Sequence, residues 1–132
     1  MANDAYLKYL EGEVLAADPV KLIRLLYDGA IDALKRAVSF MAQGEMAAKG
    51  RDLLRANDII NQFIASLDYE VGGEIAQNLD GLYRYMLDQI LLANLNNDPL
   101  RLSTVIALLS TLKSAWEEAI AAQRKQVAIG NL

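Results

Sequence analysis

The chain has 132 residues, a net charge of -4, and neither cysteine nor histidine. Without these side chains it has no disulfide, no thiolate metal site, and no imidazole as general base or metal ligand. Basic residues are scattered and outnumbered by acidic ones, which argues against a nucleic-acid binder with its usual basic stripe. Hydrophobic residues make up 54% of the chain, so we expect more apolar surface than one core hides.

The N-terminal region shows no basic segment followed by an apolar run, and the longest apolar stretches are short. We therefore expect neither a signal peptide nor membrane insertion. Residues 1–17 are predicted to form a short helical or irregular arm. Its apolar and aromatic side chains recur at helix-like spacing, which would place them against the rest of the fold: Tyr6, Tyr9, Leu10 and Val14.

The first long helix is predicted from Pro19 to about Gln43. Asp18 is a favoured N-cap, proline is favoured at the first helical position, and Gly44 suits the C-terminal cap. Its core face comprises Leu22, Leu26, Ala30, Leu34, Ala37 and Met41. The apolar stripe is wider than a core face needs, because five apolar residues together sweep more than half of the circumference: Leu25, Leu22, Leu26, Ile23 and Ile31.

The second helix is predicted from near Glu45 to near Asp68, and Gly72-Gly73 then breaks the chain. The core face of this helix comprises Leu53, Ile60, Phe63, Ile64 and Leu67. The third helix is predicted from about Glu74 to Asn94, before Asn96-Asn97. Its core face comprises Ile75, Leu79, Leu82, Tyr83, Met86 and Ile90.

The fourth helix starts with a second Asp-Pro pair, Asp98-Pro99, and is predicted to run to about Lys125. Its core face comprises Leu102, Val105, Ile106, Leu109, Leu112, Trp116 and Ile120. Residues 126–132 are expected to form a frayed tail. Because short loops join long helices, the sequence predicts an all-α fold, an antiparallel up-down-up-down four-helix bundle that forms one domain over residues 1–132.

The later helices also carry apolar residues away from their core faces: Leu54, Ile59, Leu91, Leu92 and Leu95. Such an excess marks an interaction site, although the arm, a dimer contact or ordinary scatter would also absorb it. Gly29, Gly50 and Gly81 lie inside helical patterns, where each costs about 1 kcal/mol relative to alanine. They suggest the close approach of a helix, either from the same bundle or from a partner.

A stripe of small residues on the fourth helix either packs against a second helix or is solvated, and the solvated reading is favoured: Ser103, Thr104, Ala107, Ser110, Thr111 and Ser114.

We find no constellation of residues that would carry catalysis. Asp28 and Asp32 lie one turn apart, but no carboxylates from other helices accompany them toward a metal ion. No histidine is available to activate serine or threonine, and Gly72-Gly73 lacks the pattern of a phosphate-binding loop. We therefore predict a protein that is not an enzyme and needs no metal or cofactor.

Several motifs, in this order and spacing, resemble the FliS family of flagellin export chaperones. The resemblance covers about residues 5–120, and the Leu-Tyr-Asp-Gly-Ala and Gly-Gly-Glu-Ile-Ala blocks are the most specific. The motifs are Ala5–Tyr9, Ala17–Pro19, Leu26–Ala30, Asn57–Ile60, Leu67-Asp68, Gly72–Leu79, Leu82–Met86, Ala93-Asn94 and Ala115-Trp116.

The resemblance implies a four-helix bundle in the bacterial cytoplasm that binds the C-terminal segment of flagellin, prevents premature polymerisation and assists type III export. It also implies that the arm covers part of an apolar groove until flagellin displaces it. Family motifs and excess apolar surface together give these candidate partner-binding residues: Tyr6, Tyr9, Leu10, Val14, Leu22, Leu25, Leu26, Tyr27 and Gly29.

Other readings remain open. The extra apolar stripe would also suit a self-associating helical adaptor or assembly protein without a flagellin client, and the oligomeric state is expected to be a monomer or a weak dimer. Under the chaperone reading, the expected partners are flagellin and the flagellar type III export apparatus. Nucleic acid is not expected as a partner. A further regulatory partner is compatible with the sequence.

Overall fold

The computed structural model describes residues 19–130, with side chains described over residues 20–125. It contains four helices: α2 (Pro19–Gln43), α3 (Met46–Ala65), α4 (Tyr69–Asn96) and α5 (Pro99–Gly130). No strand occurs within residues 19–130, so the predicted all-α four-helix bundle is confirmed. The N-terminal arm and Asp18 lie outside the described residues.

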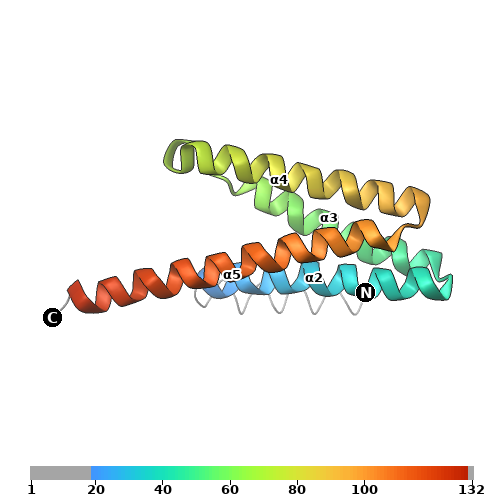
Figure 1. Cartoon of the computed structure of the whole chain (residues 1–132), viewed down its shortest axis with the longest axis horizontal. Coiled ribbons are helices and arrows are strands. Elements are labelled where there is room, and N and C mark those ends of the chain that lie inside the picture. Colours follow the sequence, from blue (N-terminus) through green and yellow to red (C-terminus); the bar gives the residue numbers. More distant parts are fainter. Residues whose placement is uncertain (1–18, 131–132) are drawn as a thin grey trace.

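The helices form a ring in which α2 packs on α3 and α5, while α4 packs on the same two neighbours. Figure 1 shows α4 diverging from α2 and α5 toward its N-terminal end, and α5 running on beyond the other helices. The bundle is therefore closed at one end and splayed at the end where α4 begins.

Two helix boundaries follow the signals expected from the sequence. Gly44 has a φ of 72°, and the next backbone N–H, from Glu45, donates to the carbonyl oxygen of Phe40 at 2.9 Å. This is the hydrogen bond of a Schellman C-cap, which needs a residue with positive φ. At the start of α5, Asp98 Oδ1 accepts the backbone N–H of Leu100 at 3.1 Å, as an N-cap does.

The boundary between α3 and α4 differs from the prediction. The second helix ends at Ala65, and α4 begins at Tyr69 rather than near Glu74. The reason is Asp68, whose side chain caps α4 by accepting backbone N–H groups from Glu70 and Val71 at 3.1 Å. The expected break appears inside α4 as a kink at Gly73, with φ 51° and ψ -122°.

The helix α5 extends beyond the expected end near Lys125. It continues to Gly130, into the segment for which a frayed tail is predicted. Residues 126–129 contain neither proline nor glycine, and nothing in their sequence stops the helix. Residues 131–132 lie outside the described part of the chain.

The core follows the predicted faces in the middle of the bundle but departs from them at several positions. Trp116, expected in the core, is exposed, and Ile31, expected beside the core face, is buried. Ile59, expected off the core face, is only 8% exposed, whereas Ile75, expected in the core, is 71% exposed. Ile75 lies just after the Gly73 kink, in the part of α4 that diverges from α2 and α5. The buried hydrophobic core includes Tyr27, Ala30, Leu34, Leu53, Ile60, Phe63, Tyr83, Met86, Ile90, Leu102, Val105 and Leu109.

Lys49 ties the start of α3 to the end of α4. It is 6% exposed, and its Nζ donates to the carbonyl oxygen of Asn94 at 3.3 Å and to Asn97 Oδ1 at 3.4 Å. The carboxyl end of a helix carries partial negative charge, so an ammonium group is stabilised there. This contact helps to hold the closed end of the bundle together.

Two helical glycines should respond to alanine in opposite ways. At Gly81 a new Cβ meets no atom within 4 Å, so Gly81→Ala should raise the free energy of unfolding by about 0.5–1 kcal/mol. At Gly73 the space is equally open, but φ is positive. Gly73→Ala should therefore lower the free energy of unfolding by about 1–2 kcal/mol.

Urea unfolding followed by circular dichroism measures both changes, and Gly81 serves as the control for Gly73 because neither new Cβ meets an obstacle. A Gly73→Ala variant as stable as the parent would contradict the strained backbone conformation assigned to that residue.

Candidate functional site

A groove of about 630 Å³ opens at the splayed end of the bundle and receives side chains from all four helices. Helix α2 contributes its first turns, α3 its last turns, α4 its kinked beginning, and α5 contributes Trp116. We call it the apolar groove. Its lining residues are Leu22, Ile23, Leu26, Tyr27, Gln62, Phe63, Ser66, Leu67, Asp68, Val71, Gly72, Ile75, Ala76, Leu79, Tyr83 and Trp116.

The walls of the apolar groove come from the widest part of each apolar stripe. On α2, Leu22, Ile23 and Leu26 lie before the first fully buried residue and are only partly covered. On α4, Val71 and Ile75 are 86% and 71% exposed. Large apolar side chains that remain exposed together around a concavity are typical of an interaction site.

The floor of the groove is a cluster of three buried aromatic residues from three helices. The hydroxyl groups of Tyr27 and Tyr83 are 2.8 Å apart and share a hydrogen bond. The ring of Phe63 stacks on Tyr27 with centroids 4.5 Å apart and lies 5.5 Å from the ring of Tyr83. Because each hydroxyl is the other's hydrogen-bond partner, neither side chain can be changed without affecting its neighbour.

Burial raises the pKa of both tyrosines above the usual value of 10.0. For Tyr83 the hydrogen bond with Tyr27 adds to this rise in pKa, whereas for Tyr27 the hydrogen bond with Tyr83 opposes it. The folded state therefore holds the tyrosine protons more tightly than the unfolded state does. This contribution to stability is fully present below pH 10 and is lost as the pH rises above it toward the raised folded-state pKa.

Removing one hydroxyl should leave the other buried without its partner. Tyr27→Phe or Tyr83→Phe should each lower the free energy of unfolding by about 1–2 kcal/mol. The double variant should lose less than the sum of the two single losses, because it leaves neither hydroxyl unpaired. As the pH rises above 10, the double variant should also lose less of its free energy of unfolding than the parent does. Urea unfolding measures these differences.

The control is Tyr85→Phe, which removes the same atom from an exposed residue and should change stability little. Additive losses from the two single substitutions would contradict the coupling between the two hydroxyls.

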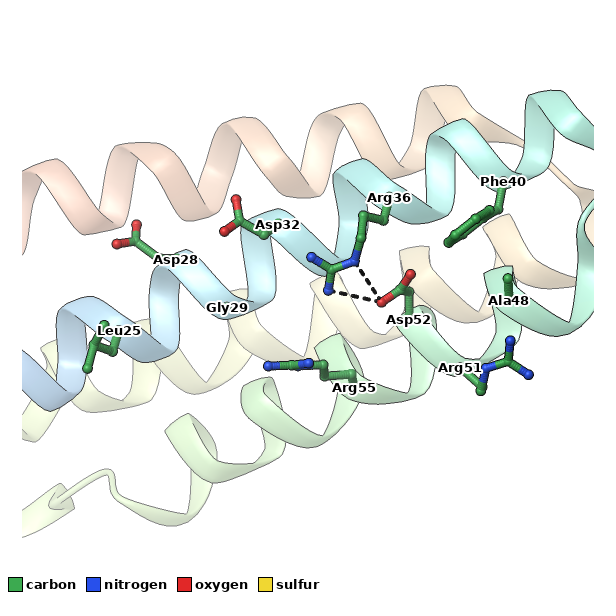
Figure 2. Close-up of a pocket in the computed structure, with 10 residues that line it drawn as sticks. All are labelled: Leu25, Asp28, Gly29, Asp32, Arg36, Phe40, Ala48, Arg51, Asp52 and Arg55. Atoms are coloured by element: carbon green, nitrogen blue, oxygen red, sulfur yellow. Dashed lines mark hydrogen bonds and ion pairs between the residues drawn. The ribbon is translucent and has the colours of Figure 1, made fainter. Parts of the chain in front are cut away.

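A second groove, of about 550 Å³, lies between α2 and α3, and its lining residues are drawn in Figure 2. We call it the polar groove. Arg36 on α2 and Asp52 on α3 bridge it through an ion pair with the closest N···O distance at 3.0 Å. Its lining residues are Leu25, Asp28, Gly29, Asp32, Arg36, Phe40, Ala48, Arg51, Asp52 and Arg55.

The candidate residues expected from the sequence fall into three groups. Leu22, Leu26 and Tyr27 line the apolar groove. Leu25 and Gly29 line the polar groove instead. The arm residues lie outside the described part of the chain: Tyr6, Tyr9, Leu10 and Val14. The candidates on α2 thus face two grooves rather than one.

Sequence reasoning did not identify the α4 and α5 walls of the apolar groove as a site. Ile75 and Trp116 had been assigned to core faces, and Val71 had no role. The sequence signal for this wall is Asp68, which is a favoured N-cap residue. Because Asp68 caps α4 ahead of the Gly-Gly pair, the helix begins earlier and includes Val71.

The remaining features expected from the sequence are the helical glycines, the stripe of small residues on α5 and the off-face leucines. A Cβ added to Gly29 would lie 3.4 Å from Ile59 Cδ1, so this glycine lets α3 approach within the bundle, while Gly50 and Gly81 face open space. The stripe of small residues on α5 is exposed, as expected for a solvated face. Leu54, Leu91 and Leu95 are exposed, whereas Leu92 is half-buried.

Within the described residues, no group of three or more Asp or Glu side chains is placed to hold a metal ion. None of the described helices combines enough length and apolar character to cross a membrane.

Comparison with known proteins gives a consistent result. The family model described as "Flagellar protein FliS" matches residues 1–123. A relative from Salmonella typhimurium, described as "Flagellar secretion chaperone FliS", is 47% identical over 110 residues, covering 83% of this chain and 82% of the relative. A relative of the same description from Vibrio cholerae is 42% identical over 109 residues, covering 83% and 80%.

A solved structure supports the fold independently. The structure described as "Crystal structure of flagellar chaperone from bacteria" matches with a TM-score of 0.74 and covers 92% of this chain and 99% of its own. Its sequence is only 15% identical, so this similarity bears on the arrangement of helices alone.

Proposed function

This chain belongs to the FliS family of flagellar secretion chaperones, and we propose from this premise that its client is flagellin. It binds the C-terminal segment of newly made flagellin in the bacterial cytoplasm, keeps that segment from polymerising early, and helps to deliver it to the type III export apparatus. The apolar groove is the observation that carries the proposal.

The apolar groove suits a helical segment with one apolar face. Val71 and Ile75 are exposed on one side of it, and Leu22, Ile23 and Leu26 are partly exposed on the other. In helix-in-groove recognition, apolar anchors spaced three or four residues apart enter a cleft of this kind. A segment that is disordered before binding loses entropy when it folds, so the interface must bury a large apolar area.

The arm is proposed to cover the apolar groove in the absence of flagellin. It joins α2 at Pro19, less than one turn before Leu22 at the rim of the groove. Tyr6, Tyr9 and Leu10 would supply the apolar contacts that flagellin replaces. Tyrosine suits such an exchange because its ring is apolar and its hydroxyl remains compatible with water.

The proposed binding function requires no catalysis, metal ion or cofactor, because association and release of the client provide the whole activity. A self-associating adaptor is the alternative, and it is favoured by a separate observation. Leu91 and Leu95 are exposed one turn apart on α4, and a second copy of the chain would cover them. A mass that does not change with protein concentration would count against this alternative.

The apolar groove can be tested by placing a charge in it without disturbing the core. Ile75→Asp should weaken binding of the flagellin C-terminal segment at least about tenfold, because a carboxylate would be desolvated on binding without a partner. Titration calorimetry of the parent protein with this segment should show a strongly negative heat-capacity change, the mark of apolar burial.

The matched control is Leu95→Asp, since Leu95 and Ile75 are both 71% exposed and lie on the same helix. Leu95→Asp should bind the segment as the parent does. Tyr6→Ala/Leu10→Ala should change the affinity if the arm covers the groove. Absence of binding by the parent at high concentration would remove flagellin as the client, and equal effects of the two aspartates would remove the apolar groove as its site.

A further inference from the structure

We infer that the polar groove is a second docking surface for the same client, where Arg51 and Arg55 bind carboxylate side chains on one face of a helical segment of flagellin. The identity of the client rests on the function proposed above. The chemistry of the groove rests on its own charges, its shape and its position beside the apolar groove.

The polar groove is lined by three carboxylates and three guanidinium groups, but not all of them form ion pairs within the described residues. Asp52 is paired with Arg36 at 3.0 Å, and Asp28 with Lys113 of α5 at 2.6 Å. Arg51 and Arg55 form no ion pair within the described part of the chain, although the protein has a net charge of -4. The α3 wall therefore presents two guanidinium groups that form no ion pair within the described residues, while the α2 wall presents one such carboxylate, Asp32.

Arg55 also has an unsatisfied hydrogen-bond donor. Its Nε is buried and has no hydrogen-bond acceptor among the described residues. Figure 2 shows its guanidinium group directed along the groove toward Gly29 and Leu25, where the α2 wall has no side chain at the glycine. A carboxylate in this space would supply a counter-charge and acceptors, and guanidinium groups match carboxylates with paired hydrogen bonds.

The rest of the polar groove suits a helix rather than a free anion. Leu25 lies near one end and Phe40 near the other, with Ala48 on the opposite wall. These side chains offer apolar contact on both sides of the Arg36–Asp52 ion pair. A segment with apolar and acidic residues on one face would complement both features, whereas a small anion would use only the arginines.

The two grooves are adjacent on α2. Leu22 lines the apolar groove and Leu25 lines the polar groove, and residues three apart on a helix are neighbours on its surface. An extended client can therefore pass over this edge of α2 from one groove to the other. Asp32, which has no ion pair within residues 20–125, would favour a basic residue of the client beside the α2 wall.

The test is a calorimetric titration with the C-terminal segment of flagellin at low and high salt. Arg51→Gln/Arg55→Gln should bind about tenfold or more weakly than the parent at low salt. Its affinity should also fall less steeply as salt is added, because the charges that salt screens have been removed. The matched control Lys35→Gln/Arg84→Gln removes two positive charges from outside both grooves and should bind like the parent.

The outcomes separate this inference from the proposed function. If the parent fails to bind the segment, both are wrong. If the Arg51/Arg55 variant binds with the parent's affinity and salt dependence, only the second docking surface is overturned. A segment with an amidated C-terminus should bind unchanged; a loss of affinity that depends on the two arginines would show that they hold the terminal carboxylate instead, which would also overturn the inference.

Charge reversal provides a positive result. Arg51→Glu/Arg55→Glu should bind the parent segment weakly and should regain affinity for a segment whose acidic residues are changed to lysine. Such recovery requires direct pairing between the two surfaces. If the variant regains affinity for none of the segments with an acidic residue changed to lysine, pairing with side-chain carboxylates is refuted. Thermal unfolding checks that each variant remains folded.

Discussion

The layer formed by Tyr27, Phe63 and Tyr83 divides the bundle into two halves. Toward the loop between α2 and α3, apolar residues of all four helices cover one another and form the buried core. On the other side of this layer the helices diverge, and the same apolar faces line the apolar groove. The three rings are at once the end of the core and the floor of the site.

Under the proposed function, this arrangement places stability and binding at different ends of the same helices. The closed end is held by the core and by Lys49 at the end of α4. At the splayed end, the Gly73 kink and the Asp68 cap keep the first turns of α4 helical without bringing them back onto α2. Apolar side chains can remain exposed there because the folding free energy comes mainly from the other half.

Local signals predicted most of the fold because the energies behind them are local. Asp98 and Gly44 act within one helical turn, and they mark helix ends in the structure as they do in the sequence. The core faces were also largely right, since three-to-four spacing follows from helix geometry alone. Periodicity shows which side of a helix is apolar, but not whether another helix covers it. Ile75 and Trp116 lie on such faces and nevertheless line the groove.

The parts that could not be predicted depend on contacts between helices. Ile59 is buried off the expected face because Gly29 leaves room for it on α2. The polar groove depends on which charges meet across α2 and α3, and the pairing of Arg36 with Asp52 spans 16 positions of the chain. The sequence shows every one of these charges, but only the structure shows that Arg51 and Arg55 form no ion pair with the other described residues.

Two adjacent grooves of different chemistry give a chaperone more than added affinity. An apolar groove binds many amphipathic helices, because apolar contact has little directional preference. Paired charges penalise a segment that binds in the wrong orientation or register, since an arginine or a carboxylate would then be desolvated without its partner. Leu22 and Leu25 place the two kinds of contact side by side on α2. The apolar groove would thus supply most of the binding free energy, and the polar groove would select the segment and direction that fit.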